Sequence, residues 1–417
     1  MATGSSLRLG TANTYDATLR NLTTRQASLS SLQEQLSSGK KINRGSDDPA
    51  GAAQAERANT RIQRIATEQR ALAAQRNTLA MTESTLGDAN AAVQSFRDLV
   101  VGAGNASYSP AERITLAKQM VALRDQLLGY ANRKDSNGLP LFSGLGSALT
   151  PFVDGATGVT FSGIGGEQAS TDVAVPYTAD GQAAWMNVPT GNGVFTATLG
   201  PGNTGSVFSD VGAVTNPSVA ALAANGYDYT INFAVAAGVT TYTVTNNTTA
   251  VTSAAAPYVA GQPIAFGGLS LTVRGTPANG DTLDLNPSAT TGPGTGLFGA
   301  IDSAITGMYA TGSVTTGASS TSASLHQSIA RALAELDTAA DRLSAVRARS
   351  GDLLNRADTI SDVQDGRDIQ LQADKSRAED IDMVKGIADF QNQQTGYQAA
   401  LQSYAQVQKL SLFNYLG

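Results

Sequence analysis

Several residue types on which protein chemistry often depends are missing or scarce in this chain. The 417 residues include no cysteine and a single histidine, His326. The lack of cysteine excludes disulfides, thiolate metal sites and a cysteine nucleophile. A lone histidine excludes zinc sites built from several histidines and weakens any case for a Ser-His-Asp triad.

Charged and aromatic residues are also scarce. Charged residues make up 15% of the chain, against about 25% in typical globular proteins, aromatics make up 6%, and the net charge is −6. A nucleic-acid binder with a basic surface is therefore not expected. There is no run of about 18 apolar residues, and the N-terminus lacks an apolar stretch, so we expect no membrane-spanning helix and no cleavable signal peptide. The protein is then either cytosolic or exported by a route that reads no such signal.

The residues that are present are unevenly distributed. Between Pro140 and Ser322 there is one basic residue, Arg274, against nine acidic ones, and this window holds 11 of the 13 prolines. It contains short alternating runs rich in Thr, Val and Tyr, such as those that begin at Tyr227, Thr240 and Leu269. Such alternation with frequent turn residues predicts antiparallel β structure. The alternative is a disordered low-complexity insert.

The flanking segments repeat apolar residues every seven positions. One line consists of Ala58, Ile65, Leu72, Leu79, Leu86, Val93 and Val100. A second line has strict 3-4 spacing and runs through Leu325, Ile329, Ala332, Leu336, Ala339, Leu343, Val346, Ser350, Leu353, Ala357 and Ile360. This is the coiled-coil period, and it predicts two long helices that pack along these lines.

Capping signals give the helix starts. Ser46-Asp47-Asp48-Pro49 offers capping oxygens before a proline, and predicts a helix over about 49–103. Ser109-Pro110-Ala111-Glu112 is a capping box, and it opens a second helix with Ile114, Val121 and Leu128 spaced by seven.

The two terminal segments have thinner apolar faces. Residues 12–38 carry Tyr15, Leu22, Leu29 and Leu36 spaced by seven, and residues 381–408 carry Met383, Phe390, Tyr397 and Tyr404. Burying so few side chains offsets only part of the backbone entropy lost on ordering each segment, because isolated helices are marginal in water. Each segment should therefore fold against another, either in the same chain or in neighbouring copies.

The segment that begins at Leu36, Leu-Ser-Ser-Gly-Lys-Lys-Ile-Asn-Arg-Gly-Ser-Asp-Asp-Pro-Ala-Gly, resembles the N-terminal signature of the bacterial flagellin superfamily. The plan of helical termini around a Gly/Thr-rich middle resembles it too. The Ser46–Pro49 stretch, the segments from Leu123 to Asn132 and from Asp135 to Gly144, and the C-terminal residues 406–417 resemble the hook-associated branch more than the filament flagellins.

This resemblance implies an α+β multidomain protein, in which both termini form a long α-helical coiled-coil rod and a β-rich outer domain is inserted between them. Residues 1–45 with 367–417 would form the terminal coiled-coil assembly domain. Residues 46–152 with 289–366 would form a helical rod domain with small β elements, and 153–288 a β-rich domain exposed to solvent.

The implied role is structural: a subunit of the bacterial flagellum that forms a junction ring between hook and filament. The predicted assembly interface comprises Leu22, Leu29, Leu36, Met383, Ile387, Phe390, Tyr397, Leu401 and Tyr404, and Ser46, Asp47, Asp48 and Pro49 form the signature helix start. The implied partners are further copies of the chain, a hook-associated protein on the hook side, a hook-associated protein or flagellin on the filament side, and an export chaperone at the C-terminal helix. Export would use the flagellar type III apparatus.

Three other functions stay open at this point. The first is a filament flagellin, present in thousands of copies, and the second is a coiled-coil stalk that presents the β-rich middle as a binding module. The third, a carboxylate enzyme in the middle domain, has no support beyond the presence of acids. Asp281 and Asp284 stand close enough to suggest calcium, but no EF-hand-like loop accompanies them. We therefore expect no catalytic residue, cofactor or metal.

Overall fold

The computed structural model describes residues 11–416, apart from residues 106, 223–224, 291, 293–294 and 313–317. Residues 1–10 of the predicted terminal domain lie outside this part. The longer helices are α1 (Thr11–Ser38), α2 (Pro49–Ala103), α3 (Pro110–Ala131), α5 (Gly296–Gly312), α6 (Ala318–Glu379) and α7 (Met383–Leu416). Two compact units are present: residues 1–70 with 361–417, and residues 71–360. No helix in the described ranges is long and apolar enough to cross a membrane.

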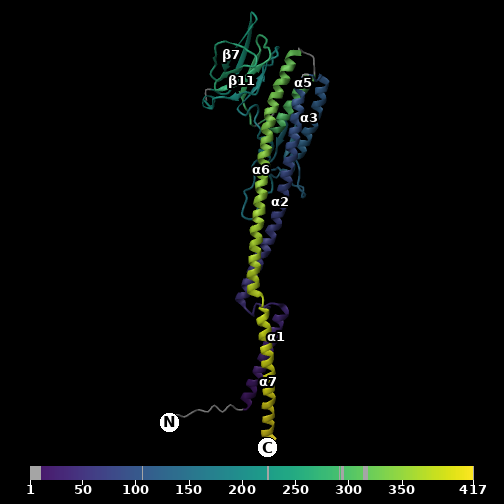
Figure 1. The fold of residues 1–417 in the computed structure, drawn as a ribbon, viewed down its shortest axis with the longest axis vertical. Coiled ribbons are helices and arrows are strands. Elements are labelled where there is room, and N and C mark those ends of the chain that lie inside the picture. Colours follow the sequence, from purple (N-terminus) through teal and green to yellow (C-terminus); the bar gives the residue numbers. More distant parts are fainter. Residues whose placement is uncertain are drawn as a thin grey trace, which may run out of the picture. The chain divides into compact units, whose positions relative to one another are not determined.

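In the unit of residues 71–360, α2 and α6 pack as an antiparallel pair (Figure 1). The direction follows from the ion pairs, because Arg76 binds Asp358 and Arg97 binds Asp337, each at 2.7 Å. The two predicted apolar lines are buried throughout this unit, except that Val346 is only partly buried. The coiled-coil prediction and the helix limits of 49–103 are confirmed.

Helices α3 and α5 complete the helical core. The capping box at the start of α3 is confirmed, since the Ser109 side chain accepts from the Glu112 amide and the Glu112 side chain accepts from the Ser109 amide. The spacing-by-seven line of α3 is only half-buried, whereas Met120 and Leu127 are fully buried. Helix α3 packs on α5, and Met120 and Leu127, which lie outside that line, join the shared core.

An aromatic cluster fills this core. The only tryptophan, Trp185, lies in the short helix η1 (Gln182–Met186) and is 0% exposed. Its ring stacks on Phe298 with centroids 6.1 Å apart and meets Phe142 and Phe152 edge-on. Phe152 begins the hairpin of β1 (Phe152–Gly155) and β2 (Gly158–Phe161).

The middle of the chain forms the expected antiparallel β structure, with a short helix α4 (Pro217–Ala220). One sheet has the order β3-β12-β6-β7-β8, with β9 beside β7, and the other has β10-β11-β4, with β5 beside β11. Their bounds are β3 (Phe195–Leu199), β4 (Phe208–Ser209), β5 (Ala213–Val214), β6 (Tyr229–Ala236), β7 (Val239–Asn246), β8 (Val251–Thr252), β9 (Ala256–Pro257), β10 (Pro263–Phe266), β11 (Leu269–Arg274) and β12 (Thr282–Pro287). Both sheets contribute to one apolar core that shares no residue with the helical core. The first and last long strands, β3 and β12, pair with each other, so the insertion enters and leaves the helical part at one place.

Polar side chains of α6 hold this β region. The Gln327 amide accepts from the Ser209 N–H at 2.8 Å and donates to the Ala197 carbonyl at 3.0 Å. Glu335 accepts from the Gly191 N–H at 2.7 Å. His326 is half-buried and stacks on Phe208. The single histidine therefore packs in an interface between α6 and the β region.

The acids that suggested calcium have structural roles. Asp281 is 1% exposed and accepts from the backbone amides of Thr204, Gly205 and Ala278. Asp284 accepts from the Thr230 hydroxyl at 2.9 Å. Among the described residues, no group of three His, Cys, Asp or Glu side chains is placed to hold a metal ion.

An extended segment over residues 166–178, which we call the strap, covers one side of the α2–α6 pair. Its Glu167 pairs with Arg349, and its Thr171 carbonyl accepts from Arg356. Val175, only 3% exposed, packs among apolar residues of both helices such as Leu72 and Leu353. The sequence did not predict the strap.

Candidate functional site

The unit of residues 1–70 with 361–417 contains the signature loop and the predicted assembly residues. Here the loop from residue 39 to residue 48, between α1 and α2, is tied to the break between α6 and α7. The Lys41 N–H donates to the Glu379 carbonyl at 2.8 Å, and the Ile381 N–H donates to the Gly39 carbonyl at 3.0 Å. Gly39 has a φ of +74°, which a glycine adopts readily at the end of a helix. The α1–α2 loop and the α6–α7 connection are thus hydrogen-bonded to each other, and we call this contact the joint.

The signature residues build the start of α2. Asp48 accepts from the Ala50 and Gly51 amides at 3.1 and 3.0 Å, which satisfies two free N–H groups of the first turn. Asp47 accepts from the Asn43 and Arg44 amides and so fixes the loop itself. Pro49 is the first helical residue, as predicted, and Ser46 is exposed.

Close contacts at position 51 explain why a glycine follows this motif. A Cβ at this position would lie 2.6 Å from both the Asp48 carboxylate and the Ile42 side chain. Ile42 is 7% exposed and anchors the loop against α2. A larger residue at position 51 would therefore push the capping carboxylate and the anchor apart.

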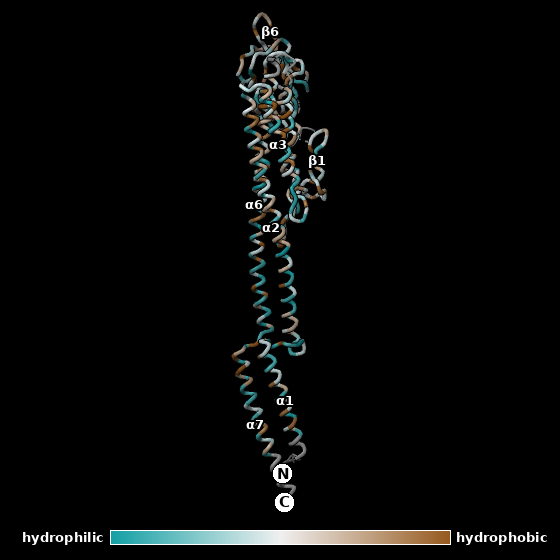
Figure 2. The backbone as a smooth tube through the Cα atoms, turned by 90° about the vertical axis from the view of Figure 1, so that its right-hand side faces the viewer, coloured by the Kyte–Doolittle hydropathy of each residue, from teal (hydrophilic) through white to brown (hydrophobic). Residues whose placement is uncertain are grey.

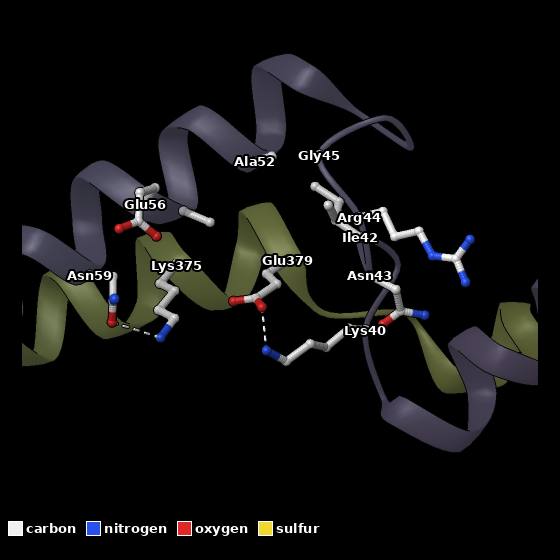
Figure 3. A pocket seen from close by; sticks show the side chains of 11 residues that line it. Lys40, Ile42, Asn43, Arg44, Gly45, Ala52, Glu56, Asn59, Lys375 and Glu379 are labelled. Atoms are coloured by element: carbon white, nitrogen blue, oxygen red, sulfur yellow. Dashed lines mark hydrogen bonds and ion pairs between the residues drawn. The ribbon is translucent and has the colours of Figure 1, made fainter.

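A groove of about 340 Å³ lies beside the joint, between α2 and the end of α6 (Figure 3). Some of its charged groups are bonded within it: the Lys40 ammonium pairs with Glu379, and Lys375 donates to the Asn59 side chain at 3.1 Å. The hydrogen bond and the charge of Glu379 raise the pKa of Lys40. Arg44 pairs with Glu34 at 3.4 Å. This chemistry is that of an ion-paired joint between chain segments, without a nucleophile and base in contact.

The predicted assembly residues lie on α1 and α7, which pack against each other (Figures 1 and 2). Of the nine, one is buried, Leu22 at 9% exposure. Half-buried are Leu29, Leu36, Phe390, Tyr397 and Tyr404. Met383, Ile387 and Leu401 are exposed, at 46%, 46% and 42%. The pair therefore covers only part of its own apolar surface.

Two further apolar side chains join this uncovered surface. Val384 is 82% exposed and Leu19 is 44% exposed. Val384 lies outside the line of residues spaced by seven, so periodicity gave no signal for it. The helices come close at Gly386, where a Cβ would lie 3.0 Å from the Leu36 side chain.

Known proteins show similarity over the helical parts. The family model for the bacterial flagellin N-terminal helical region matches residues 10–147, and that for the C-terminal helical region matches residues 333–416. Flagellar hook-associated protein 3 of Salmonella typhimurium is 35% identical over 155 residues, which are 36% of this chain and 48% of that protein. The flagellar filament 41 kDa core protein of Borreliella burgdorferi is 32% identical over 124 residues, 30% of this chain and 37% of that protein. The matches thus span about half the length of these relatives, or less.

Solved structures extend the similarity beyond the helical ends. The crystal structure of the flagellar junction protein FlgL from Legionella pneumophila superposes with a TM-score of 0.65 at 27% identity. The superposition covers 73% of this chain and 99% of that one.

Proposed function

Because this chain belongs to the bacterial flagellin family, whose members are structural and not enzymatic, we propose that it is the subunit of the ring that joins the flagellar hook to the filament. The observation that carries the proposal is the likeness to the Legionella junction protein over 99% of that chain. The 35% identity with hook-associated protein 3 supports it. A filament flagellin is the second candidate, because the Borreliella filament protein is 32% identical over a similar stretch.

The mechanism proposed is helix packing between copies. The uncovered side chains on α7, Met383, Ile387 and Leu401, would be buried against α1 or α7 of neighbouring subunits, together with the half-buried members of the predicted interface. In this proposal residues 1–45 with 367–417 are the assembly domain and residues 46–152 with 289–366 the helical domain. Of residues 153–288, predicted as the outer domain, the part up to Val188 packs with the helical core, so only the β region that follows it would lie at the outer surface.

Assembly with other flagellar components follows from this role. The specific partners we propose are a hook-associated protein on the hook side, a hook-associated protein or flagellin on the filament side, and an export chaperone that holds α7 before assembly. The uncovered apolar side chains of α7 support a chaperone, since such surface would otherwise promote aggregation.

The location can be tested with gold-labelled antibody on isolated flagella, viewed by electron microscopy. A single band at the end of the hook is the expected result, and depletion of the protein should release filaments from hooks. Label along the whole filament would instead make the chain a flagellin.

The interface can be tested with Leu401→Asp. At 42% exposure this change should leave the melting temperature of the isolated protein nearly unchanged. It should block incorporation into flagella, because a carboxylate would be buried between helices. Leu222→Asp, at an exposed position of the β region (59%), is the matched control and should incorporate normally. Normal flagella bearing Leu401→Asp would contradict the proposed interface.

A further inference from the structure

A second groove, of about 600 Å³, lies between the first turns of α2 and the last turns of α6. Four cationic side chains line it: Lys41, Arg57, Arg61 and Arg377. Ala58 and Leu371 are among its apolar lining residues. We call this site the basic groove.

Its positive charge is only partly compensated. Arg57 and Arg61 are exposed, and within the described residues neither makes an ion pair or a hydrogen bond. They stand four residues apart on one helix, where two like charges repel each other and weaken the helix. Arg377 pairs with Asp374 in its own helix at 2.5 Å. The groove thus keeps two unpaired guanidinium groups beside apolar side chains.

A surface of opposite charge lies on α6 itself. Asp362 is exposed and has no partner among the described residues, and Asp365, also exposed, accepts only from Gln69 at 2.6 Å. Ile369 is exposed beside them, at 69%. Asp362, Asp365 and Ile369 are three, four and seven residues apart and so share one side of the helix. We call Asp362, Asp365 and Ile369 the acidic face.

The acidic face combines an exposed isoleucine with two exposed carboxylates, and this combination is typical of an interface. The outward line of a surface helix is normally polar. Charged rims around an apolar contact are typical of protein–protein interfaces. The acidic face offers carboxylates and an aliphatic side chain, and the basic groove offers guanidinium groups and apolar lining.

We propose that the basic groove of one copy receives the acidic face of a second copy. This inference rests on the proposed function, since it names the lateral contact of the proposed ring. The unpaired arginines of the basic groove lie on α2, and the acidic face lies on an earlier stretch of α6, so the contact joins unlike surfaces of the two copies. Contacts of this kind, repeated, generate a ring or a helical array, whereas a contact of a surface with itself would stop at a dimer.

The chain itself shows how arginines along α6 are covered. Arg349, Arg356 and Arg377 are separated by multiples of seven residues. The strap supplies Glu167 to Arg349 and the Thr171 carbonyl to Arg356. No comparable segment of the described chain covers Arg57 and Arg61, and in this proposal a second copy supplies their acidic partners.

The absence of cysteine allows a direct test by disulfide trapping. The variant Arg61→Cys/Asp362→Cys, expressed in cells and oxidised in isolated flagella, should give a ladder of multimers on a non-reducing gel. Each single-cysteine variant should give none. Only monomer from the double variant, with or without an internal disulfide, would overturn the contact.

Charge exchange provides a second test. Arg57→Glu/Arg61→Glu should abolish incorporation, and so should Asp362→Arg/Asp365→Arg, because each juxtaposes like charges. Combining all four changes in one chain should restore incorporation. Arg70→Glu is the matched control, since Arg70 is exposed on α2 and bonds only within its own helix. Normal incorporation of Arg57→Glu/Arg61→Glu, or failure of the combined variant while its melting temperature is unchanged, would overturn the proposal.

These readouts separate the contact from the proposed function. The disulfide ladder requires only that copies are neighbours, wherever they lie in the flagellum. A ladder with label along the whole filament would retain the contact and reject the junction role. A band at the hook end without a ladder would retain the junction role and reject the contact.

Discussion

Truncation of Phe298 to alanine should destabilise the helical core around Trp185 and leave the β region folded. Phe298 is 0% exposed on α5, and its ring stacks on Trp185 and lies 6.4 Å from Phe152. Both neighbours are themselves buried, so little in the surroundings can move into the space. The change therefore removes the buried ring and leaves a cavity.

The size of the effect follows from that geometry. Loss of a fully buried phenylalanine costs about 3–5 kcal/mol, with the upper end expected where the site cannot collapse. For a unit of this size, about 2–4 °C of melting temperature is lost per kcal/mol. We therefore expect the transition seen at Trp185 to fall by roughly 6–20 °C.

The single tryptophan makes the assay local. Unfolding followed by Trp185 fluorescence reports the helical core alone, because no other tryptophan contributes. The matched control is Phe233→Ala: Phe233 is 2% exposed and has an aromatic neighbour, Tyr258, but lies in the β core. Phe233→Ala should lower the melting temperature of the β region, followed by far-ultraviolet circular dichroism, and leave the Trp185 transition in place. A loss below about 1 kcal/mol for Phe298→Ala, or equal shifts for both variants, would refute the account of two separate cores.

Two predictions concern pH and have opposite signs. Burial raises the pKa of the Glu335 carboxyl above 4.5, against the opposing effects of Arg331 and the Gly191 amide. Folding favours the protonated carboxyl, so the contribution of Glu335 to the free energy of unfolding is greatest below pH 4.5 and is lost as pH rises through the folded-state pKa. In Glu335→Gln, the melting temperature should therefore depend less on pH over this range. The Arg124 guanidinium lowers the pKa of Asp154 below 3.8, so that contribution is present above 3.8 and is lost as pH falls through the folded-state pKa. The protection of the β1–β2 hairpin amides, measured relative to the intrinsic exchange rate at each pH, should therefore fall in acid, and Asp154→Asn should show the low protection already at neutral pH; unchanged protection would contradict this.

The helical parts of the fold could be read from the sequence because their signals are local. The line from Ala58 to Val100 and the capping oxygens before Pro49 predicted a helix over about 49–103, and α2 spans Pro49–Ala103. The run that begins at Leu269 likewise coincides with β11. In each case spacing and capping within one segment contain the whole signal.

The contacts between segments could not be read in this way. The strap is rich in small residues without a period, and only Val175 is deeply buried, so nothing in it marks its position on α2 and α6. Gln327 and Glu335 look like residues of a solvated helix face, yet they bind the β region. The pairing of β3 with β12 joins residues more than eighty positions apart, which alternation within either strand does not specify.

The same distinction, between signals within one segment and contacts between segments, applies to the predicted assembly residues. Spacing by seven gave the correct helices, but it did not tell which side chains the chain covers by itself. Leu22 is already buried in the single chain, whereas Met383 and Leu401 are not. Val384, which spacing by seven did not include, is more exposed than either of them. Only the packing of α1 on α7 separates these cases.

The seam of α6 changes from apolar to polar toward its C-terminal end, in the same unit as the surfaces that we propose for partners. Up to Ile360 its positions are apolar except Ser350, but the next ones are Gln364 and Arg367. Gln364 is 1% exposed, and neither polar atom of its amide has a hydrogen-bond partner within the described chain. A buried polar group without a partner costs about 1–3 kcal/mol, so packing in this segment is weaker than in the apolar seam. The grooves beside α2 and the uncovered faces of α1 and α7 belong to this same unit. The unpaired charges and uncovered apolar side chains of this unit are therefore available to the neighbouring subunits that we propose, whereas we expect the well-packed unit of residues 71–360 to fold without them.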